Sequence, residues 1–350
     1  MPKNAFSYDR LNFQKPQVNL ARPAAGRMWL VSLCALMAVV QSGMGDNFSS
    51  LIAALSAVLA AVLTEFLILH KRGRVFNLKD GSAAASALIL ALLLPNRISP
   101  VYAAAGAVFA IAVVKHSFGG LGSNWLNPAA GGWLFIRFSW PSAFSAALET
   151  SPLSLLAGSL SRGLANPQDS PLGILKIDGG GLFAVPSGID SLVRSFFNTF
   201  VFSAAGTELP GGYIDLFFSP APGIIADRGV LALLLGSVII TASQVSRAWV
   251  SALWLAVFGF LVRLAGALPY GGGWWRGDVL FAFCSGGTLA AAFLLAADPA
   301  TGAKSNWGIF LAALAGGVFA FLFRYQGGEP YGAVFAVVLV NALLPLVRKF

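Results

Sequence analysis

Charged side chains are scarce in this sequence of 350 residues. Asp, Glu, Lys and Arg together make up 11% of the chain, whereas hydrophobic residues make up 57%. A typical soluble domain carries about 25% charged residues, so the composition excludes an ordinary soluble protein. Apolar runs of roughly 17–25 residues are long enough to cross a bilayer as helices. The sequence therefore predicts an integral membrane protein.

Cysteine and histidine are also scarce, with two of each. Cys34 and Cys284 lie in apolar stretches, and two cysteines are too few to ligate an iron–sulfur cluster without a partner subunit, so we interpret them as small core residues. His70 and His116 each end a predicted helix beside a basic residue, which favours the membrane interface over joint haem ligation. The sequence has no P-loop, no Rossmann glycine fingerprint and no metal-ligand spacing. We therefore predict no metal site and assign any nucleotide chemistry to other subunits.

The hydropathy pattern predicts an all-α integral membrane protein with about ten transmembrane helices and one long external loop. The expected spans are centred near Leu36, Leu59, Leu90, Ala107, Phe135, Leu234, Val257, Leu289, Ala315 and Leu339. The chain then divides into a cytoplasmic segment (1–27), helices one to five (28–148), the external loop (149–228) and helices six to ten (229–350).

The net charge of +9 is distributed unevenly along the chain. Basic residues gather before the first helix, after the second, and in the other connections expected on that side of the membrane. The positive-inside rule then places both termini in the cytoplasm and the long loop outside, in the inner membrane of the cell. We interpret this charge as a topology signal and expect no nucleic-acid partner. About 27 polar and basic residues precede the first helix, so we expect no signal peptide.

Two stretches, 81–135 and 286–345, repeat the same order of breaks and helices. Each opens with glycine before a run of small residues, which ends at Pro95 in the first stretch and at Pro299 in the second. Each continues with an apolar helix, a Gly-Gly pair and a further apolar helix. Interrupted helices are tolerated at membrane depth where protein shields them or where they line a cavity. Because the third helix would run outward and the eighth inward, we predict an inverted repeat with a binding site between its halves.

Paired amides lie at the start of the fifth predicted helix. Asn124 and Asn127 are three residues apart, after Gly119 and Gly120 and directly before Pro128. On a helix that begins here they share a face. An amide both donates and accepts hydrogen bonds, as the edge of a flavin or quinone ring requires. Asn127 is equally suited to cap the helix, and the two roles are compatible.

Acidic residues inside apolar helices are the candidates for an ion pathway. Glu65 lies about five residues from the cytoplasmic end of its helix, and acids at membrane depth are energetically costly. A second interpretation is an interfacial carboxylate paired with Lys71 or Arg72. Asp298 lies similarly near the cytoplasmic face. Arg263, inside an apolar helix, needs a partner that the sequence does not identify.

Several short segments spread over most of the chain carry a common pattern. They are Ala61-Val62-Leu63-Thr64-Glu65, Asp80-Gly81-Ser82, Leu92-Leu93-Leu94-Pro95, the stretch 118–129, Ile214-Asp215-Leu216-Phe217, Ala232-Leu233-Leu234-Leu235-Gly236, Ser285-Gly286-Gly287-Thr288, Asp298-Pro299-Ala300-Thr301 and Asn341-Ala342-Leu343. Together they resemble the RnfD/NqrB family, the membrane subunits of the ion-translocating ferredoxin:NAD oxidoreductase (Rnf) and of the sodium-translocating NADH:quinone reductase.

The resemblance implies a ten-helix subunit that works with several membrane and peripheral partners, holds flavin and relays electrons across the membrane. It implies that the amides matching Asn124 and Asn127, beside Gly119 and Gly120, approach a non-covalent flavin (riboflavin or FMN). It also implies that the acid matching Glu65 belongs to the cation pathway, with Asp298 as a second candidate.

The sequence departs from the family at one motif. Family members commonly bear Ser-Gly-Ala-Thr in the external loop, where FMN phosphate is joined to the threonine hydroxyl. Here the matching segment 186–192 places Asp190 at the acceptor position, and a carboxylate cannot form that phosphoester. We therefore predict that covalent FMN is absent. Ser191, displaced by one residue, and Thr207 are the remaining hydroxyl candidates.

The leading hypothesis is a flavin-binding subunit of a redox-driven, cation-translocating complex between ferredoxin and NAD, with no complete active site in this chain alone. One alternative is an autonomous secondary transporter, which the inverted repeat alone would favour. Another is a scaffold subunit that has lost its flavins. The sequence does not distinguish sodium from protons, because a carboxylate in a polar cavity serves either. It also leaves open the immediate electron donor and acceptor.

Overall fold

The computed structural model describes residues 24–44, 48–73, 80–117, 124, 126–144, 188–202, 214–218, 223–270, 273–303 and 305–347. Every regular element among them is a helix, and their β-type pairing is limited to one isolated bridge between Pro95 and Ile224. The predicted all-α class is confirmed. Gly119, Gly120, Thr207 and most of the predicted external loop lie outside the described residues.

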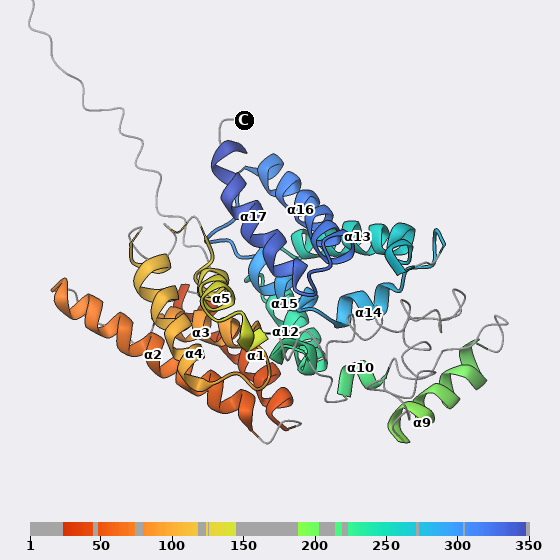
Figure 1. Ribbon diagram of the computed structural model, residues 1–350, viewed down its shortest axis with the longest axis horizontal. Coiled ribbons are helices and arrows are strands. Elements are labelled where there is room, and N and C mark those ends of the chain that lie inside the picture. Colours follow the sequence, from red (N-terminus) through yellow and green to blue (C-terminus); the bar gives the residue numbers. More distant parts are fainter. Residues whose placement is uncertain are drawn as a thin grey trace, which may run out of the picture.

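The two halves of the chain form two adjacent groups of helices, drawn in red to yellow and in teal to blue in Figure 1. The first half comprises α1 (Ala24–Met44), α2 (Ser49–Lys71), α3 (Ser82–Leu92), α4 (Pro100–Phe109), the π-helix η2 (Ala110–Lys115) and α5 (Pro128–Ser139). The second comprises α11 (Ile225–Arg228), α12 (Val230–Ala242), α13 (Ala248–Ala265), η5 (Leu268–Tyr270), α14 (Val279–Cys284), α15 (Thr288–Ala290), η6 (Ala291–Ala296), α16 (Asn306–Phe321), η7 (Leu322–Gln326) and α17 (Gly332–Val347).

Among the described helices, four are long and apolar enough to cross a membrane. They are Ala25–Met44, Ser49–Lys71, Ala248–Ala265 and Asn306–Gln326. Shorter apolar helices accompany them, and the 11 residues of α3 span only about 17 Å at 1.5 Å per residue. These findings agree with a multi-pass membrane protein, while the number of ten spans stays a prediction.

The exposed face of α2 shows what surrounds the protein. Leu55, Leu59 and Leu63 are 59%, 62% and 57% exposed, and their spacing of four residues places them on one face of the helix. A stripe of large apolar side chains of this kind is unfavourable in water. Contact with lipid or with an apolar partner surface accounts for it.

The predicted repetition of helices and breaks is present in the structure. In each half a short helix follows a glycine in the left-handed conformation, Gly81 before α3 and Gly287 before α15, both with a φ of 67°. A side chain would be strained at that φ, which is why glycine stands there. The next helix continues into a π-helix, η2 or η7, and a third helix follows. Corresponding pairs also pack together: α2 on α4 and α13 on α16, and α4 on α5 and α16 on α17.

Small residues bring these helices close together. A Cβ atom added at Gly132 in α5 would lie 2.7 Å from the carbonyl oxygen of Gly106 in α4. Close approach of this kind increases van der Waals contact where lipid supplies no hydrophobic drive between helices. It also holds α3, whose residues Leu90 and Leu92 are fully buried, between the longer helices.

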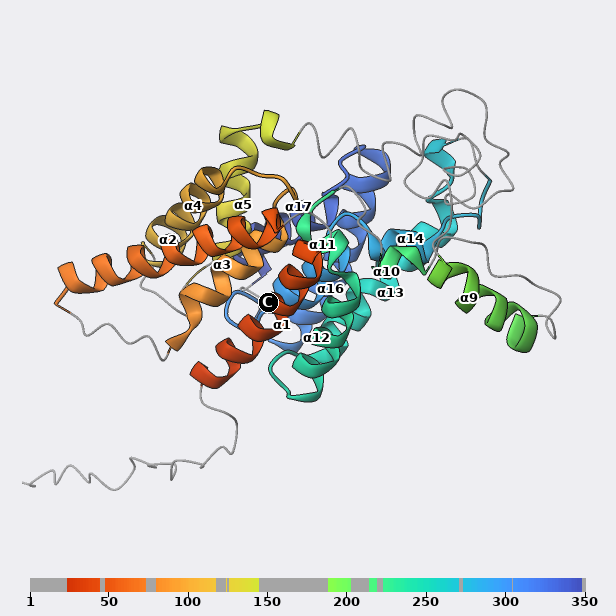
Figure 2. The same ribbon diagram turned by 90° about the horizontal axis from the view of Figure 1, so that it is seen from below.

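Between the halves, α9 (Gly188–Phe197) and the π-helix η3 (Asn198–Phe202) lie at the periphery in both views (Figures 1 and 2). Leu192 and Phe200 are exposed there, whereas Asp190 is buried and its Oδ1 accepts a hydrogen bond from the backbone N–H of Ile214 at 3.2 Å. Close by in sequence, α10 (Asp215–Phe218) packs against α12. Asp190 thus ties α9 to the segment that leads into α10.

Candidate functional site

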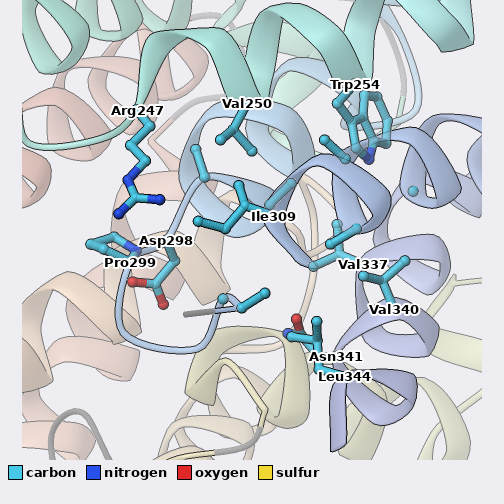
Figure 3. A pocket seen from close by; sticks show the side chains of 17 residues that line it. Arg247, Val250, Trp254, Asp298, Pro299, Ile309, Val337, Val340, Asn341 and Leu344 are labelled. Atoms are coloured by element: carbon cyan, nitrogen blue, oxygen red, sulfur yellow. The ribbon is translucent and has the colours of Figure 1, made fainter. Parts of the chain in front are cut away.

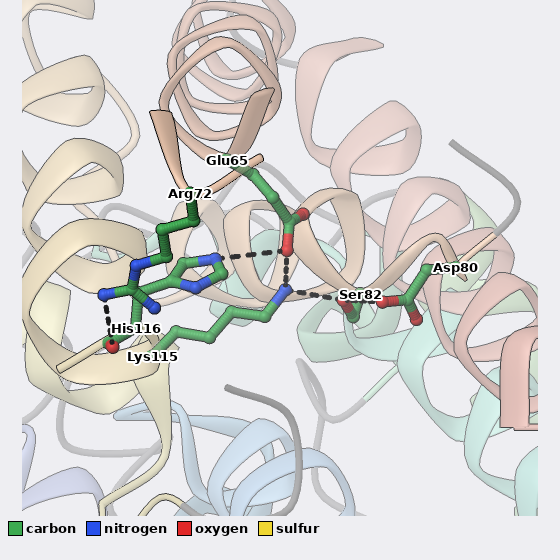
Figure 4. A network of polar contacts seen from close by, with 6 residues as sticks. All are labelled: Glu65, Arg72, Asp80, Ser82, Lys115 and His116. Carbon is green, nitrogen blue, oxygen red and sulfur yellow. Dashed lines mark hydrogen bonds and ion pairs between the residues drawn. The ribbon is translucent and has the colours of Figure 1, made fainter. Parts of the chain in front are cut away.

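Glu65 lies in a buried network of charged and polar side chains at the ends of α2, η2 and α3 (Figure 4). The Nζ of Lys115 donates to Glu65 Oε1 at 2.5 Å and to the hydroxyl of Ser82 at 2.6 Å. The Ser82 hydroxyl in turn donates to Asp80 at 3.0 Å. Glu65 is 8% exposed and Lys115 only 2%. Burying both charges is tolerable because each is paired and hydrogen-bonded.

The predicted pairing of Glu65 with Lys71 or Arg72 is wrong. Both of those side chains are exposed at the end of α2, whereas Lys115 reaches Glu65 from η2. Arg72 instead donates to the backbone carbonyl of His116 at 3.3 Å. The expectation that His116 lies at the interface is also wrong, because its side chain is buried with Nε2 3.4 Å from Glu65 Oε1.

The π-helix η2 helps to place Lys115 and His116. The backbone N–H of His116 bonds to the carbonyl of Ile111, five residues back, at 3.1 Å. This wider turn rotates the side chains that follow relative to an α-helix, and such turns are frequent at functional sites. No sequence pattern indicates the wider turn, so from the sequence Lys115 is only a charge on the cytoplasmic side.

Asn127 joins the two halves of the chain. Its Oδ1 accepts from the backbone N–H of Ala129 at 2.9 Å, which is the expected cap of α5. Its Nδ2 donates to Asp298 Oδ2 at 2.9 Å, across the boundary between the repeats. Asp298 also accepts from the Thr301 hydroxyl at 3.1 Å and from the backbone N–H of Ala300 at 2.9 Å. Two of the predicted site residues, Asn127 and Asp298, are therefore in direct contact.

A cavity of about 320 Å³ lies between the halves at this contact. Its polar lining comes from both repeats and includes Ser82, Lys115, Asn124, Asn127, Asp298 and Thr301. Apolar side chains from α1, α3 and η6 complete the wall. Glu65 lines a different space, a groove of about 600 Å³ between α1, α2 and α3. Since Lys115 bonds to Glu65 and lines the cavity, the Glu65–Lys115 pair separates the two spaces.

Asp298 also lines a second cavity, of about 260 Å³, on the other side of its loop (Figure 3). Arg247, Trp254 and Asn341 contribute polar groups to this cavity. The Nε1 of Trp254 and the Nδ2 of Asn341 are buried and have no hydrogen-bond partner among the described residues. In the sequence Asn341 is only part of a repeated pattern, and no signal there singles out Trp254 or Arg247 for a site.

Two further buried charges are not evident from the sequence. Arg324 is 1% exposed in η7, and Asp227 is 5% exposed in α11. Asp227 falls inside the predicted external loop, yet its carboxylate accepts from the backbone N–H of Gly287 at 2.8 Å within the helical body. Arg263, for which the sequence identifies no partner, donates to the carbonyl of Gly277 at 3.3 Å.

Metal-binding clusters of three or more His, Cys, Asp or Glu side chains are absent from the part of the chain that the structure describes. Cys34 and Cys284 are both buried and neither forms a disulfide. The polar chemistry of the described residues is therefore that of acids, amides, hydroxyls and buried cations placed at helix breaks.

A multi-pass helical protein that pairs two matching sets of broken helices, with buried acids and cations at the breaks, has the construction of carriers and ion-translocating membrane proteins. The comparison with known families is more specific. The chain belongs to the NQR2, RnfD, RnfE family, whose model matches residues 12–350.

Relatives resemble the chain over nearly its full length, and each is named as the RnfD-type component of its complex. The one from the proton-translocating ferredoxin:NAD(+) oxidoreductase complex of Clostridium ljungdahlii is 28% identical, over 99% of this chain and 95% of the relative. The one from the ion-translocating oxidoreductase complex of Alcanivorax borkumensis is 33% identical, over 87% of this chain and 84% of the relative. The one from the Na(+)-translocating ferredoxin:NAD(+) oxidoreductase complex of Acetobacterium woodii is 26% identical, over 96% of this chain and 91% of the relative.

Proposed function

We propose that this chain is the RnfD-type membrane subunit of an ion-translocating ferredoxin:NAD oxidoreductase complex. In that complex it would hold a non-covalent flavin and part of the cation pathway, alongside other membrane and peripheral subunits. Near full-length similarity to components of complexes with these names supports the assignment to a complex. The observation that carries the two finer roles is the cavity between the repeats, where the amide pair, Asp298 and Lys115 meet.

The cavity suits a flavin ring in size and chemistry. Its volume of about 320 Å³ falls in the range of roughly 300–1,000 Å³ that is usual for small-molecule sites. After capping α5 and bonding Asp298, the Asn127 amide retains one N–H and one carbonyl lone pair. Asn124, buried on the same wall, adds a second amide. When bound, a flavin supplies one- and two-electron transfer; the amides orient its polar edge, and the apolar wall excludes water.

We further propose that the flavin of this subunit is held without a covalent bond. Asp190, at the position of the family's acceptor threonine, is 1% exposed and engaged with the backbone of Ile214. The hydroxyl of Ser191 donates to the carbonyl of Gly188 at 2.9 Å within α9. Both side chains therefore have roles in holding α9, and the carboxylate cannot accept a phosphoester.

Glu65 and Lys115 supply the group that responds to the cation. A buried carboxylate that is neutralised by lysine is able to exchange that partner for sodium or for a proton, because lysine is a flexible point charge. Exchange at Glu65 would connect the groove between α1, α2 and α3 with the cavity beside the amide pair. The names of the relatives include both sodium and proton, so this proposal extends to either ion.

The whole complex, purified from its source membrane, tests the assignment. We expect mild acid extraction to release a flavin that is missing from the double variant Asn124→Leu, Asn127→Leu, and both termini to be accessible only from the cytoplasmic side of the inner membrane. Genes for iron–sulfur and NADH-binding subunits beside this gene would favour the complex over an autonomous transporter. A complex with intact electron transfer and no flavin assignable to this subunit would leave the scaffold alternative.

A further inference from the structure

The guanidinium of Arg324 lies inside a set of oxygen atoms at the break between α14 and α15. Its Nη1 donates to the carbonyls of Ala282 and Ser285 at 2.8 and 2.9 Å and to the hydroxyl of Thr288 at 2.8 Å. Its Nη2 donates to the hydroxyl of Ser285 at 2.5 Å. Two carbonyls and two hydroxyls thus converge on one buried cation.

These oxygens are of the kind that binds inorganic cations. The carbonyls of Ala282 and Ser285 belong to the C-terminal end of α14, where carbonyls lack intrahelical partners and carry the negative end of the helix dipole. In membrane carriers with broken helices, such half-helix ends coordinate sodium or protons. Carbonyl and hydroxyl oxygens are also the ligands that hard cations prefer. Here the position is filled by a side chain of the protein itself.

A carboxylate completes the surroundings of Arg324. Asp227 interacts electrostatically with Arg324 and caps the start of α15 through the backbone N–H of Gly287. The break therefore offers oxygen ligands from α14 and α15 and a negative charge from α11. All of these groups lie within one buried cluster that includes none of the residues of the amide cavity.

The first half of the chain has a corresponding arrangement. Lys115 ends the π-helix η2, as Arg324 lies in the π-helix η7. Lys115 bonds to Ser82 directly after Gly81, and Arg324 bonds to Thr288 directly after Gly287. Each cation is also close to one buried acid. The difference is that lysine is a point charge, whereas arginine cannot be deprotonated in proteins and holds its partners with a rigid fork.

We propose that Arg324 is a tethered cation that occupies a cation-binding site of the second module and thereby prevents sodium ions or protons from leaking through the subunit. The inference rests on the proposed function, because it assumes that a cation crosses this chain. Arg324 seals the second module permanently, whereas the Glu65–Lys115 pair of the first module exchanges with the transported ion.

The test uses the whole complex in sealed liposomes without an electron donor. A potassium diffusion potential drives sodium or protons, and their uptake is followed with radioactive sodium or a pH-sensitive dye. We expect Arg324→Ser to raise the leak on the order of tenfold. Millimolar guanidinium should then suppress the leak, since the free ion fits the vacated oxygens. Arg324→Lys, which keeps a cation, and Arg276→Ser, which removes an exposed arginine, should stay as tight as the wild type.

An assembled Arg324→Ser complex that is as tight as the wild type would overturn the proposal, and so would a leak that guanidinium does not reduce. If that variant does not assemble, Thr288→Val decides, because it removes one hydroxyl ligand and keeps the shape; a tight Thr288→Val complex also overturns the proposal. Redox-driven uptake by the wild type is measured in the same liposomes. Its absence would count against the proposed function, whereas the guanidinium-sensitive leak reports on Arg324 alone.

Discussion

The two modules of this protein differ most at their buried cations. In the first, Lys115 makes one contact with a carboxylate and one with a hydroxyl, and it borders the cavity that we assign to flavin. In the second, Arg324 makes hydrogen bonds to four oxygens and caps the end of α14. A similar backbone thus carries one ion pair that is able to exchange and one that is fixed. The comparison teaches that a repeated fold can divide transport and sealing between its halves.

The largest effect should come from breaking the exchangeable pair. Lys115→Met leaves the Glu65 carboxylate buried with only His116 close to it among the described residues. Loss of one partner of a buried ion pair costs about 3–5 kcal/mol, which thermal or denaturant unfolding of the purified subunit in detergent would show. The double variant Lys115→Met, Glu65→Gln removes both charges and should recover most of that loss. Losses that simply add would mean that the two residues are not a pair.

The next effect concerns the cavity that only the first module lines with paired amides. The variant Asn124→Leu, Asn127→Leu should release the flavin, since each lost hydrogen bond contributes about 0.5–1.5 kcal/mol. Flavin per complex is measured by fluorescence after extraction. Asn341→Leu, which changes an amide lining the other cavity, is the matched control and should retain flavin. Full retention in the double variant would sink the assignment.

A smaller change sharpens the contrast between lysine and arginine. Lys115→Arg keeps the charge beside Glu65 but replaces a point charge by a fork that binds a carboxylate through two hydrogen bonds. We expect an assembled complex whose ion-dependent NAD reduction slows about tenfold. The measurement is the rate as a function of sodium concentration and of pH. An unchanged rate would show that exchange at Lys115 does not limit transport.

The smallest effect is an expected absence of change. Because Asp190 stands at the family's acceptor position, this polypeptide should show no flavin fluorescence on a denaturing gel, even after co-expression with its own flavin transferase. Asp190→Ala should leave the flavin content of the complex unaltered while loosening α9, whose tie to Ile214 it removes. A fluorescent band for the wild type would contradict the prediction and would direct attention to Ser191 and Thr207.

The helices and the repeated breaks could be predicted from the sequence because both depend on local signals. Glycine before small residues, proline after them and apolar length locate α3, α15 and the helices between. Local signals also locate Asn127 as a cap and Glu65 as a buried acid. The contacts of Asn127 with Asp298 and of Glu65 with Lys115 could not be predicted, because these pairs lie far apart in the chain. The π-helices that aim Lys115 and Arg324 leave no periodic signal, so the tethered cations are visible only in the structure.

The exchange of a cation at Glu65 is the central claim, and one measurement tests it most directly. Wild-type and Glu65→Gln complexes are placed in sealed liposomes, and cation uptake is recorded together with ferredoxin-driven NAD reduction. We predict that uptake per electron falls about tenfold in Glu65→Gln, while the passive leak stays at the wild-type level because Arg324 is untouched. An unchanged ratio of ions to electrons in the assembled variant would contradict the account.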